Sequence, residues 1–172
     1  MATESDPSRD ITCTIGGIVV EAARIERLVT MLVGRFLCSD IGTDVIGGQN
    51  WSTLYPMCLR VIASRSEQLA SDPESDRYPH HAAAFDELPD LLNRANVMMA
   101  KRNRIVHGNW FVEVRPDGTA ILETLHMRSG KTSSQTWTSD ELRELRRDME
   151  LVGDEIGKHT DRTRDLCQRL AG

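Results

Sequence analysis

Apolar residues recur at intervals of three and four over two long stretches of this sequence, and that spacing constrains the fold more than any other feature. Such intervals place the apolar side chains on one face of an α-helix. The first stretch begins at Thr14 and ends before Ser39, and it carries Ile15, Ile18, Val19, Ala22, Ile25, Val29, Leu32, Val33 and Phe36. We therefore predict a long first helix with one buried face.

The second stretch begins where Thr138 and Glu141 have the spacing of a capping box at a helix start. A stripe of mostly apolar residues follows, made of Leu142, Leu145, Met149, Val152, Ile156, His159, Thr163, Leu166 and Leu170. A heptad-like stripe flanked by charged residues is typical of a helix that packs within a bundle, and also of a dimer seam. Both interpretations of the 142–170 stripe stay open at this point.

Two further helices are predicted between these two. One runs from Trp51 to about Leu69, and residues 71–76 carry the turn formers of a loop. The other begins near Asp86, has Pro89 in its first turn, and continues into a basic cluster at residues 101–104. Gly108 follows this cluster closely, where it suits a left-handed residue just past a helix end.

The spacing changes from helical to alternating after Gly108. Trp110, Val112 and Val114 alternate with other residues, a Pro-Asp-Gly turn occupies 116–118, and residues 120–127 and 133–137 have β-type composition. Aromatic residues make up only 5% of the chain, so the core must be largely aliphatic, which favours helices over a large sheet.

We predict a mainly α fold. It is a bundle of four to five helices with a small antiparallel β-hairpin or meander inserted at about residues 110–138, before the last long helix. Residues 1–10 are expected to be a disordered N-terminal tail, and residues 11–172 a single helical domain.

The composition excludes several classes of protein. A net charge of −5 and a pI of about 5.5 do not suit a protein that holds duplex DNA by neutralising many phosphates. The four cysteines lie far apart, which predicts reduced, mostly buried thiols and neither a disulfide framework nor a zinc site. Phosphate-loop and dinucleotide-binding motifs are missing from the sequence. We predict no metal and no cofactor.

The location of the protein is predicted from its polar start and from its hydropathy. Residues 1–10 are acidic and polar, unlike a signal or transit peptide. No apolar run approaches the roughly 20 residues that cross a bilayer. We expect a cytoplasmic protein with no membrane contact.

The segment 101–110, KRNRIVHGNW, is the most unusual part of the sequence, because three basic residues stand almost together in an acidic protein. Cleaving RNA without a metal requires one group to take the 2′-hydroxyl proton and another to protonate the leaving oxygen. Histidine, with an unperturbed pKa of about 6.5, suits both tasks, so His107 is a candidate. The negative transition state needs a cation, and the guanidinium of Arg102 can grip two phosphate oxygens.

The spacing of these two residues limits how they can work together. Five positions along a regular helix place Arg102 and His107 about 140° apart. Either the helix end unwinds at Gly108, or the working pair comes from two chains. We favour the second, since a two-fold axis would bring both copies of the segment together.

Arg102, Asn103 and His107 resemble the signature of the HEPN superfamily, in which an arginine and a polar residue precede a histidine four to six positions further on. The resemblance implies a HEPN-like bundle and a metal-independent endoribonuclease of toxin or defence type that cuts RNA at a homodimer cleft. It also implies that His107 is the general acid or base, that Arg102 binds phosphate and stabilises charge, and that Asn103 orients the pair.

Three neighbours complete the predicted RNA-binding surface. Lys101 and Arg104 would contact phosphates, and Trp110 could stack an unpaired base. The expected partners are therefore RNA or a nucleotide, a second copy of the chain and, as a further candidate, an antitoxin protein.

Other interpretations stay open. Arg102 could pair with an acidic side chain of a neighbouring helix, such as Glu21 or Glu26, and His107 could cap the helix end. The chain could also be a non-catalytic module of the same fold that binds a nucleotide or a partner, or a purely structural dimerisation bundle. The remaining histidines carry no motif: His80-His81 is expected in a solvated loop, while His126 and His159 are interpreted as packing residues.

Overall fold

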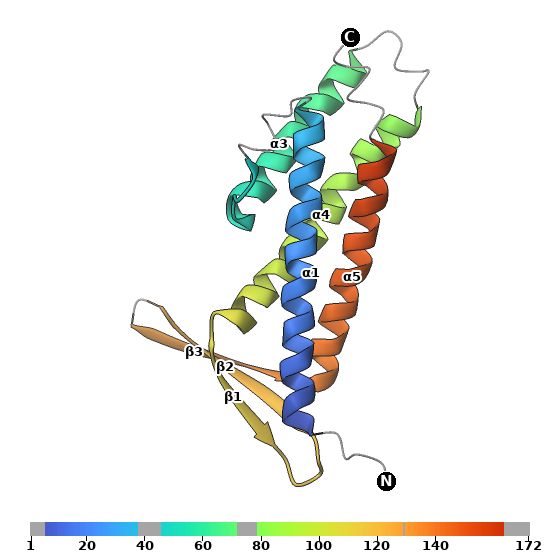
Figure 1. The fold of residues 1–172 in the computed structure, drawn as a ribbon. Helices are drawn as coiled ribbons and strands as arrows, with labels where there is room; N and C mark the ends of the chain where they lie inside the picture. Colours follow the sequence, from blue (N-terminus) through green and yellow to red (C-terminus); the bar gives the residue numbers. More distant parts are fainter. Residues whose placement is uncertain (1–5, 38–45, 72–78, 129, 164–172) are drawn as a thin grey trace, which may run out of the picture. The chain divides into compact units, whose positions relative to one another are not determined.

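The computed structural model describes residues 6–37, 46–71, 79–128 and 130–163 (Figure 1). This part of the chain forms four helices and three strands. In chain order they are α1 (Pro7–Phe36), α3 (Trp51–Ala70), α4 (Pro79–Val106), β1 (Asn109–Val114), β2 (Ala120–Arg128), β3 (Lys131–Thr138) and α5 (Ser139–Arg162). A mainly helical fold with a small antiparallel sheet before the last long helix is confirmed.

Helix α1 begins earlier than the sequence analysis predicted. Asp6 caps it, because its carboxylate accepts a hydrogen bond from the backbone N–H of Ser8 at 3.0 Å. Pro7 occupies the first helical position, where a missing N–H costs nothing, and Ile11 is 1% exposed. The prediction of a disordered tail is therefore wrong for residues 7–10, while residues 1–5 lie outside the described residues.

Helix α4 also begins earlier than predicted, at Pro79 instead of near Asp86. The backbone at His80-His81 is therefore helical and not a loop, and Pro89 lies inside the helix instead of in its first turn. The reason is local: Pro79 is itself the proline of the first turn, and the alanines at 82–84 have the highest helix propensity. Helix α3 matches its predicted bounds to within one residue.

The chain divides into two compact units, which we call the sheet unit (residues 1–22 and 97–150) and the helical unit (residues 23–96 and 151–172). The sheet unit contains all three strands, the end of α4 and the starts of α1 and α5. The helical unit contains α3 and the remaining parts of the other helices. The single domain expected over residues 11–172 stays a prediction.

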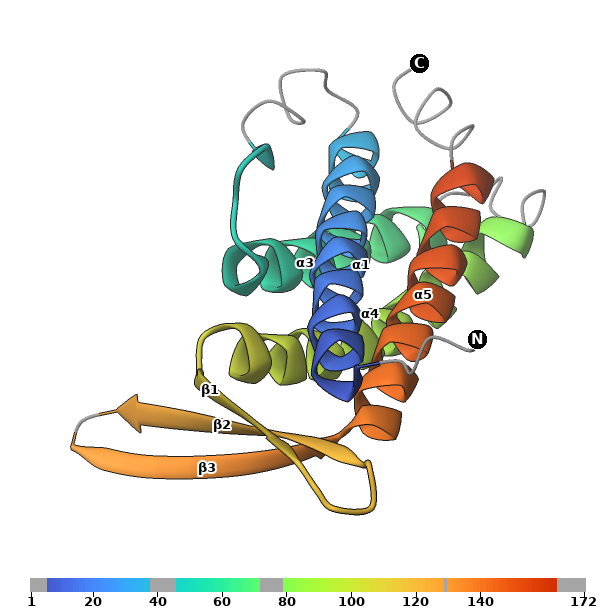
Figure 2. The ribbon, with the colours of Figure 1, turned by 60° about the horizontal axis from the view of Figure 1, so that its bottom comes forward.

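The three strands form a meander with the order β1-β2-β3 (Figure 2). In the register of β1 and β2, Asn109 lies opposite Leu125 and Val114 lies opposite Ala120. Strands β2 and β3 extend past β1 as a longer hairpin, in which Arg128 lies opposite Lys131. The predicted Pro-Asp-Gly turn joins β1 to β2, and Gly118 supplies the left-handed backbone it needs, with φ +80°.

Helix α5 begins at the predicted capping box. The backbone N–H of Thr138 donates to the Glu141 carboxylate at 2.7 Å, and the N–H of Glu141 donates to the Thr138 hydroxyl at 3.2 Å. The described members of the 142–170 stripe, up to Thr163, are all buried. They pack within the chain, which supports the bundle interpretation of the stripe; Leu166 and Leu170 lie outside the described residues.

In the helical unit, an aromatic contact and a hydrogen bond join elements distant in sequence. The rings of Phe36 and Phe85 have centroids 5.1 Å apart, and the indole N–H of Trp51 donates to Asn96 at 2.9 Å. Cys58 is buried, and burial raises the pKa of its thiol to about 12. Cys13, in the sheet unit, is exposed, which differs from the expectation of buried thiols.

Among the described residues, no helix has both the length and the apolar character of a membrane span.

Candidate functional site at the end of α4

The predicted site residues gather where α4 ends and β1 begins, and we call residues 101–110 the α4 tip. Ile105, in the middle of the tip, is fully buried and anchors it to the core of the sheet unit. The residues around it are mostly exposed: Lys101, Asn103, Arg104, His107 and Trp110 all present their side chains to solvent, and Arg102 is half-buried. Burying one side chain thus holds a basic surface in place.

Arg102 and Asn103 contact each other. The Arg102 guanidinium donates from Nη1 to the Asn103 side-chain oxygen at 2.8 Å. The Arg102 Nε atom is buried without a hydrogen-bond partner. Among the described residues Arg102 forms no ion pair, so the alternative that a neighbouring carboxylate neutralises it is not supported. Its positive charge stays available to an anion.

His107 lies one residue past the last turn of α4. Its backbone N–H donates to the carbonyl of Asn103 at 3.0 Å, which is the α-helical pattern of bonding four residues back. Its side chain is exposed and forms no hydrogen bond or ion pair within the described part of the chain. The imidazole is therefore free to meet a ligand.

The regular helix end keeps Arg102 and His107 apart. Because helical bonding continues to His107, the last turn has not unwound, and the two side chains remain about 140° apart around the axis. No hydrogen bond between them is found among the described residues. Of the two arrangements predicted from sequence, a distorted helix end is thus not supported.

Gly108 does not have the left-handed backbone that we predicted, since the glycines with positive φ in the described chain are Gly48, Gly118 and Gly130. Glycine is needed here for space. A Cβ at this position would lie 3.0 Å from the Arg104 carbonyl oxygen, 3.0 Å from His126 Nε2 and 3.1 Å from the Thr124 side chain. The backbone of the α4 tip passes directly beneath the ring of His126.

Trp110 and Arg104 fasten the α4 tip to its surroundings. The indole N–H of Trp110 donates to the backbone carbonyl of Ile105, one of the carbonyls left unpaired by the end of the helix. Arg104 donates to the side-chain oxygen of Gln135, in β3, at 3.2 Å. Trp110 therefore has a structural role, although 41% of its surface remains exposed and able to stack.

Sequence analysis missed two residues beside the α4 tip. His126 was interpreted as a packing residue without a named contact; its Nε2 atom is buried beside Gly108 and has no hydrogen-bond partner among the described residues. Gln135 was not considered, yet it holds Arg104. Both come from strands that lie beyond the motif in sequence, so only the strand register brings them close. The one available signal in the sequence was Gly108, a glycine at the start of the predicted hairpin, where another group can lie close to the backbone.

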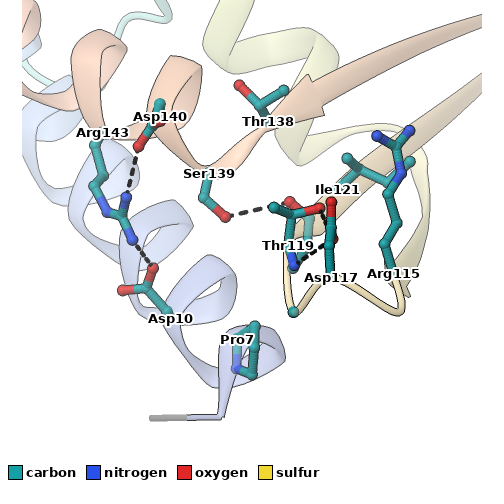
Figure 3. Close-up of a pocket in the computed structure, with 12 residues that line it drawn as sticks. Pro7, Asp10, Arg115, Asp117, Thr119, Ile121, Thr138, Ser139, Asp140 and Arg143 are labelled. Carbon is teal, nitrogen blue, oxygen red and sulfur yellow. Dashed lines mark hydrogen bonds and ion pairs between the residues drawn. The ribbon is translucent and has the colours of Figure 1, made fainter.

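The sheet unit also contains a cavity of about 480 Å³ where the β1–β2 turn meets the starts of α1 and α5 (Figure 3). Most of its charged groups are already satisfied. Arg143 donates to Asp140 at 2.8 Å and to Asp10, and Asp117 accepts from the backbone and hydroxyl of Thr119 at 2.9 and 2.6 Å. These hydrogen bonds lower the pKa of Asp117 and raise that of Arg143. None of the predicted site residues lines this cavity.

Arg115, on the rim of the same cavity, differs from its neighbours. Its side chain is exposed and makes no hydrogen bond or ion pair with the described residues, although its charge is among the causes that lower the pKa of Asp117. It is thus a second available guanidinium in the sheet unit, at the opposite end of β1 from the α4 tip.

Comparisons of this chain with protein-family models, with curated proteins and with solved structures find no match. Among the described residues there is also no cluster of three or more His, Cys, Asp or Glu side chains that could hold a metal ion.

Proposed function

We propose that this protein is a metal-independent endoribonuclease of HEPN type, acting in toxin or defence systems, with His107 as its acid–base group and Arg102 as a phosphate-binding group. The observation that carries the proposal is the availability of both side chains. Within the described part of the chain, His107 is exposed without a side-chain partner, and Arg102 is hydrogen-bonded only to Asn103. A structural ion pair or a helix cap would have occupied them instead.

The chemistry requires one proton acceptor and one proton donor near the same phosphodiester. His107 takes the proton from the 2′-hydroxyl, whose oxygen forms a bond to phosphorus as the bond to the 5′-oxygen breaks. His107, now protonated, gives this proton to the leaving 5′-oxygen, and the products are a cyclic phosphate and a free 5′-hydroxyl. Arg102, with Lys101 and Arg104 beside it, binds the phosphates of the strand.

A second copy of the chain belongs to the proposal. Since the regular helix end directs Arg102 and His107 to different sides, one α4 tip does not offer the imidazole and the Arg102 guanidinium to the same phosphate. A partner subunit that brings another cation to His107 would complete the site.

The test is RNA cleavage in the presence of EDTA by three purified variants. His107→Ala should lower the cleavage rate by about 100-fold or more, since general acid–base catalysis typically contributes that much. Arg102→Ala should mainly raise KM. The control, Arg147→Ala, removes a charge of the same sign from an exposed position of α5 and should cleave like the wild type.

Cleavage by His107→Ala at the wild-type rate would refute the proposal. Tight nucleotide or RNA binding without turnover by the wild type would instead establish the alternative, a non-catalytic binding module of the same fold.

A further inference from the structure

Strand β1 is an edge strand whose outer side has no partner in the sheet. An edge exposes unpaired N–H and C=O groups, and proteins usually protect it with charged residues, proline or bulges. Strand β1, NWFVEV, has one charged residue, Glu113, and all six of its residues are exposed. Its large apolar side chains are exposed by 41% at Trp110, 56% at Phe111, 38% at Val112 and 50% at Val114. Strand β1 thus lacks most of the protection that is usual for an edge strand.

Strand β3, at the other edge, is protected. It begins with Lys131, continues through exposed serines and threonines, and its one large apolar side chain, Trp137, is only 5% exposed. The two edges of the sheet thus differ in how well they are protected against pairing with a strand of another molecule. Only β1 offers apolar side chains next to its free backbone groups.

The backbone of β1 determines which groups point outward. The N–H of Arg115 donates to the carbonyl of Thr119, which continues the β1–β2 register by one step. Hydrogen-bonded positions alternate along an antiparallel pair. Phe111 and Glu113 therefore bond inward to β2, while the N–H and C=O groups of Trp110, Val112 and Val114 point to the free side.

We propose that β1 pairs antiparallel with β1 of a second copy of this chain, on a two-fold axis that passes through Val112. This register places Val112 opposite itself and Trp110 opposite Val114. All three outward-facing residues of each copy then meet outward-facing residues of the other. Each donates one hydrogen bond and accepts one, so the pair of strands makes about six.

The side chains favour the same register. Apolar residues meet apolar residues on one face of the paired strands, and on the other face Phe111 lies opposite Glu113, so no like charges oppose. A pairing centred on Glu113 would place that carboxylate opposite itself and Trp110 opposite Pro116, which has no N–H. A pairing centred on Phe111 would leave Val114 opposite no residue of β1. The Val112 register therefore uses the strand most fully.

This pairing has a consequence for the α4 tip, which rests on the function proposed above. Asn109 lies opposite Arg115 of the partner subunit, so the partner's guanidinium comes to the part of the chain that carries His107, two positions before Asn109. The two copies of Asn109 are six strand positions apart, about 20 Å. The dimer then has two equivalent sites, each built from one chain's α4 tip and the partner's β1–β2 turn, in place of the single shared cleft that the motif implied.

Disulfide trapping tests the interface without any RNA substrate. Two Val112→Cys residues would face each other across the axis with Cα atoms about 5.5 Å apart, within disulfide range. Mild oxidation should therefore give several-fold more covalent dimer than the wild type, which carries the same native cysteines. Phe111→Cys places its copies about 8 Å apart, too far to link, and Ser134→Cys tests the β3 edge. Both variants should form no more covalent dimer than the wild type does.

Sedimentation of charge variants tests the register in solution. Phe111→Glu brings like charges together with the partner's Glu113 and should give monomers, whereas Phe111→Arg should keep the dimer. The control is Thr136→Glu. Phe111 and Thr136 both lie opposite Glu123, on its two sides, so this variant introduces the same charge beside the same residue but at the β3 edge.

The proposal is overturned if Val112→Cys links no better than the wild type, or if Phe111→Cys links better than Val112→Cys. Neither outcome depends on RNA cleavage, so failure of the interface and failure of the proposed activity can be told apart.

Discussion

Gly108 joins α4 to β1, and a side chain at this position would meet both the end of α4 and strand β2. One step beyond the β1–β2 register it stands opposite His126, and the missing side chain lets that ring lie over the backbone. Two of the three atoms that a Cβ would meet are the Arg104 carbonyl oxygen, in the last turn of α4, and the buried Nε2 atom of His126. The position of His107, the preceding residue, depends on this close approach.

The first prediction is that Gly108→Ala destabilises the protein by about 1–3 kcal/mol, the usual cost of overpacking. Chemical denaturation monitored by circular dichroism measures it. Gly16→Ala is the matched control: a Cβ there meets nothing within 4 Å, and Gly16 lies inside α1. Alanine should stabilise that helix by up to about 1 kcal/mol. Equal effects of the two substitutions would contradict the packing argument.

His159 gives the helical unit a dependence on pH. It is buried, and this burial lowers the pKa of its imidazole below the ordinary 6.5, although Glu87, 3.4 Å away, acts in the opposite direction. Below pH 6.5 the unfolded chain binds a proton that the folded chain does not yet bind. The free energy of unfolding therefore falls as the pH drops through this value toward the lower folded pKa.

The second prediction is that His159→Gln reduces this loss of stability. Tm should fall less between pH 7.5 and about 5.5 in the variant than in the wild type, as measured by thermal unfolding. Glu87→Gln should have the reverse effect, because it removes a charge that favours the protonated imidazole. If the three proteins lose stability in parallel, His159 does not control the effect.

At the scale of the elements, the start of α5 depends on one reciprocal pair of bonds. The side chains of Glu141 and Thr138 each accept a hydrogen bond from the other's backbone N–H group, and N–H groups at a helix start have no partner within the helix.

The third prediction is that Thr138→Ala costs about 0.5–2 kcal/mol of stability, the range measured for caps. Thr136→Ala is its control, since that threonine is exposed on the same face of β3 and makes no side-chain bond among the described residues. Urea denaturation of both variants decides the matter: an equally large loss at Thr136 would mean that strand propensity, and not the cap, is responsible.

How far each element could be predicted depended on whether its signal was local. The spacing of α1 and α5 and the cap at Thr138 are local, and they were predicted correctly. The start of α4 was misplaced because Pro89 was interpreted as an N-terminal proline, when Pro79 had that position and the alanines after it carried the helix forward.

The composition of the α4 tip was likewise visible in the sequence, but its environment was not. His126 and Gln135 reach the tip through the register of β2 and β3, and registers are set by packing across the whole sheet. The role of Gly108 was assigned to its backbone angle instead of to a close contact, because only the register places His126 over it. The exposure of His107 could not be read from the sequence, because it depends on which neighbours leave it uncovered.

At the scale of the whole molecule, the proposed dimer predicts that two inactive variants restore each other. In a mixture of His107→Ala and Arg115→Ala chains, each mixed dimer has one site with both groups intact. Half of the dimers are mixed at random association, so about a quarter of the wild-type cleavage rate should return. RNA cleavage by the co-refolded mixture, against each variant alone, measures this.

A mixture of His107→Ala with Arg102→Ala is the control for that experiment. Arg102 of one chain is too far from His107 of the other in the Val112 register to complete its site, so mixing these two variants should add no activity to that of each variant measured alone. Recovery with Arg102→Ala, and none with Arg115→Ala, would show that the two chains meet in another way.

The polar character of β3 limits how large the assembly can grow. Once two β1 strands have joined, the continuous sheet of six strands has β3 at both margins, where Lys131 and a row of hydroxyl groups offer little to a third molecule. Association that uses one margin of each sheet closes on itself, so it ends in a finite pair and does not propagate as a fibre.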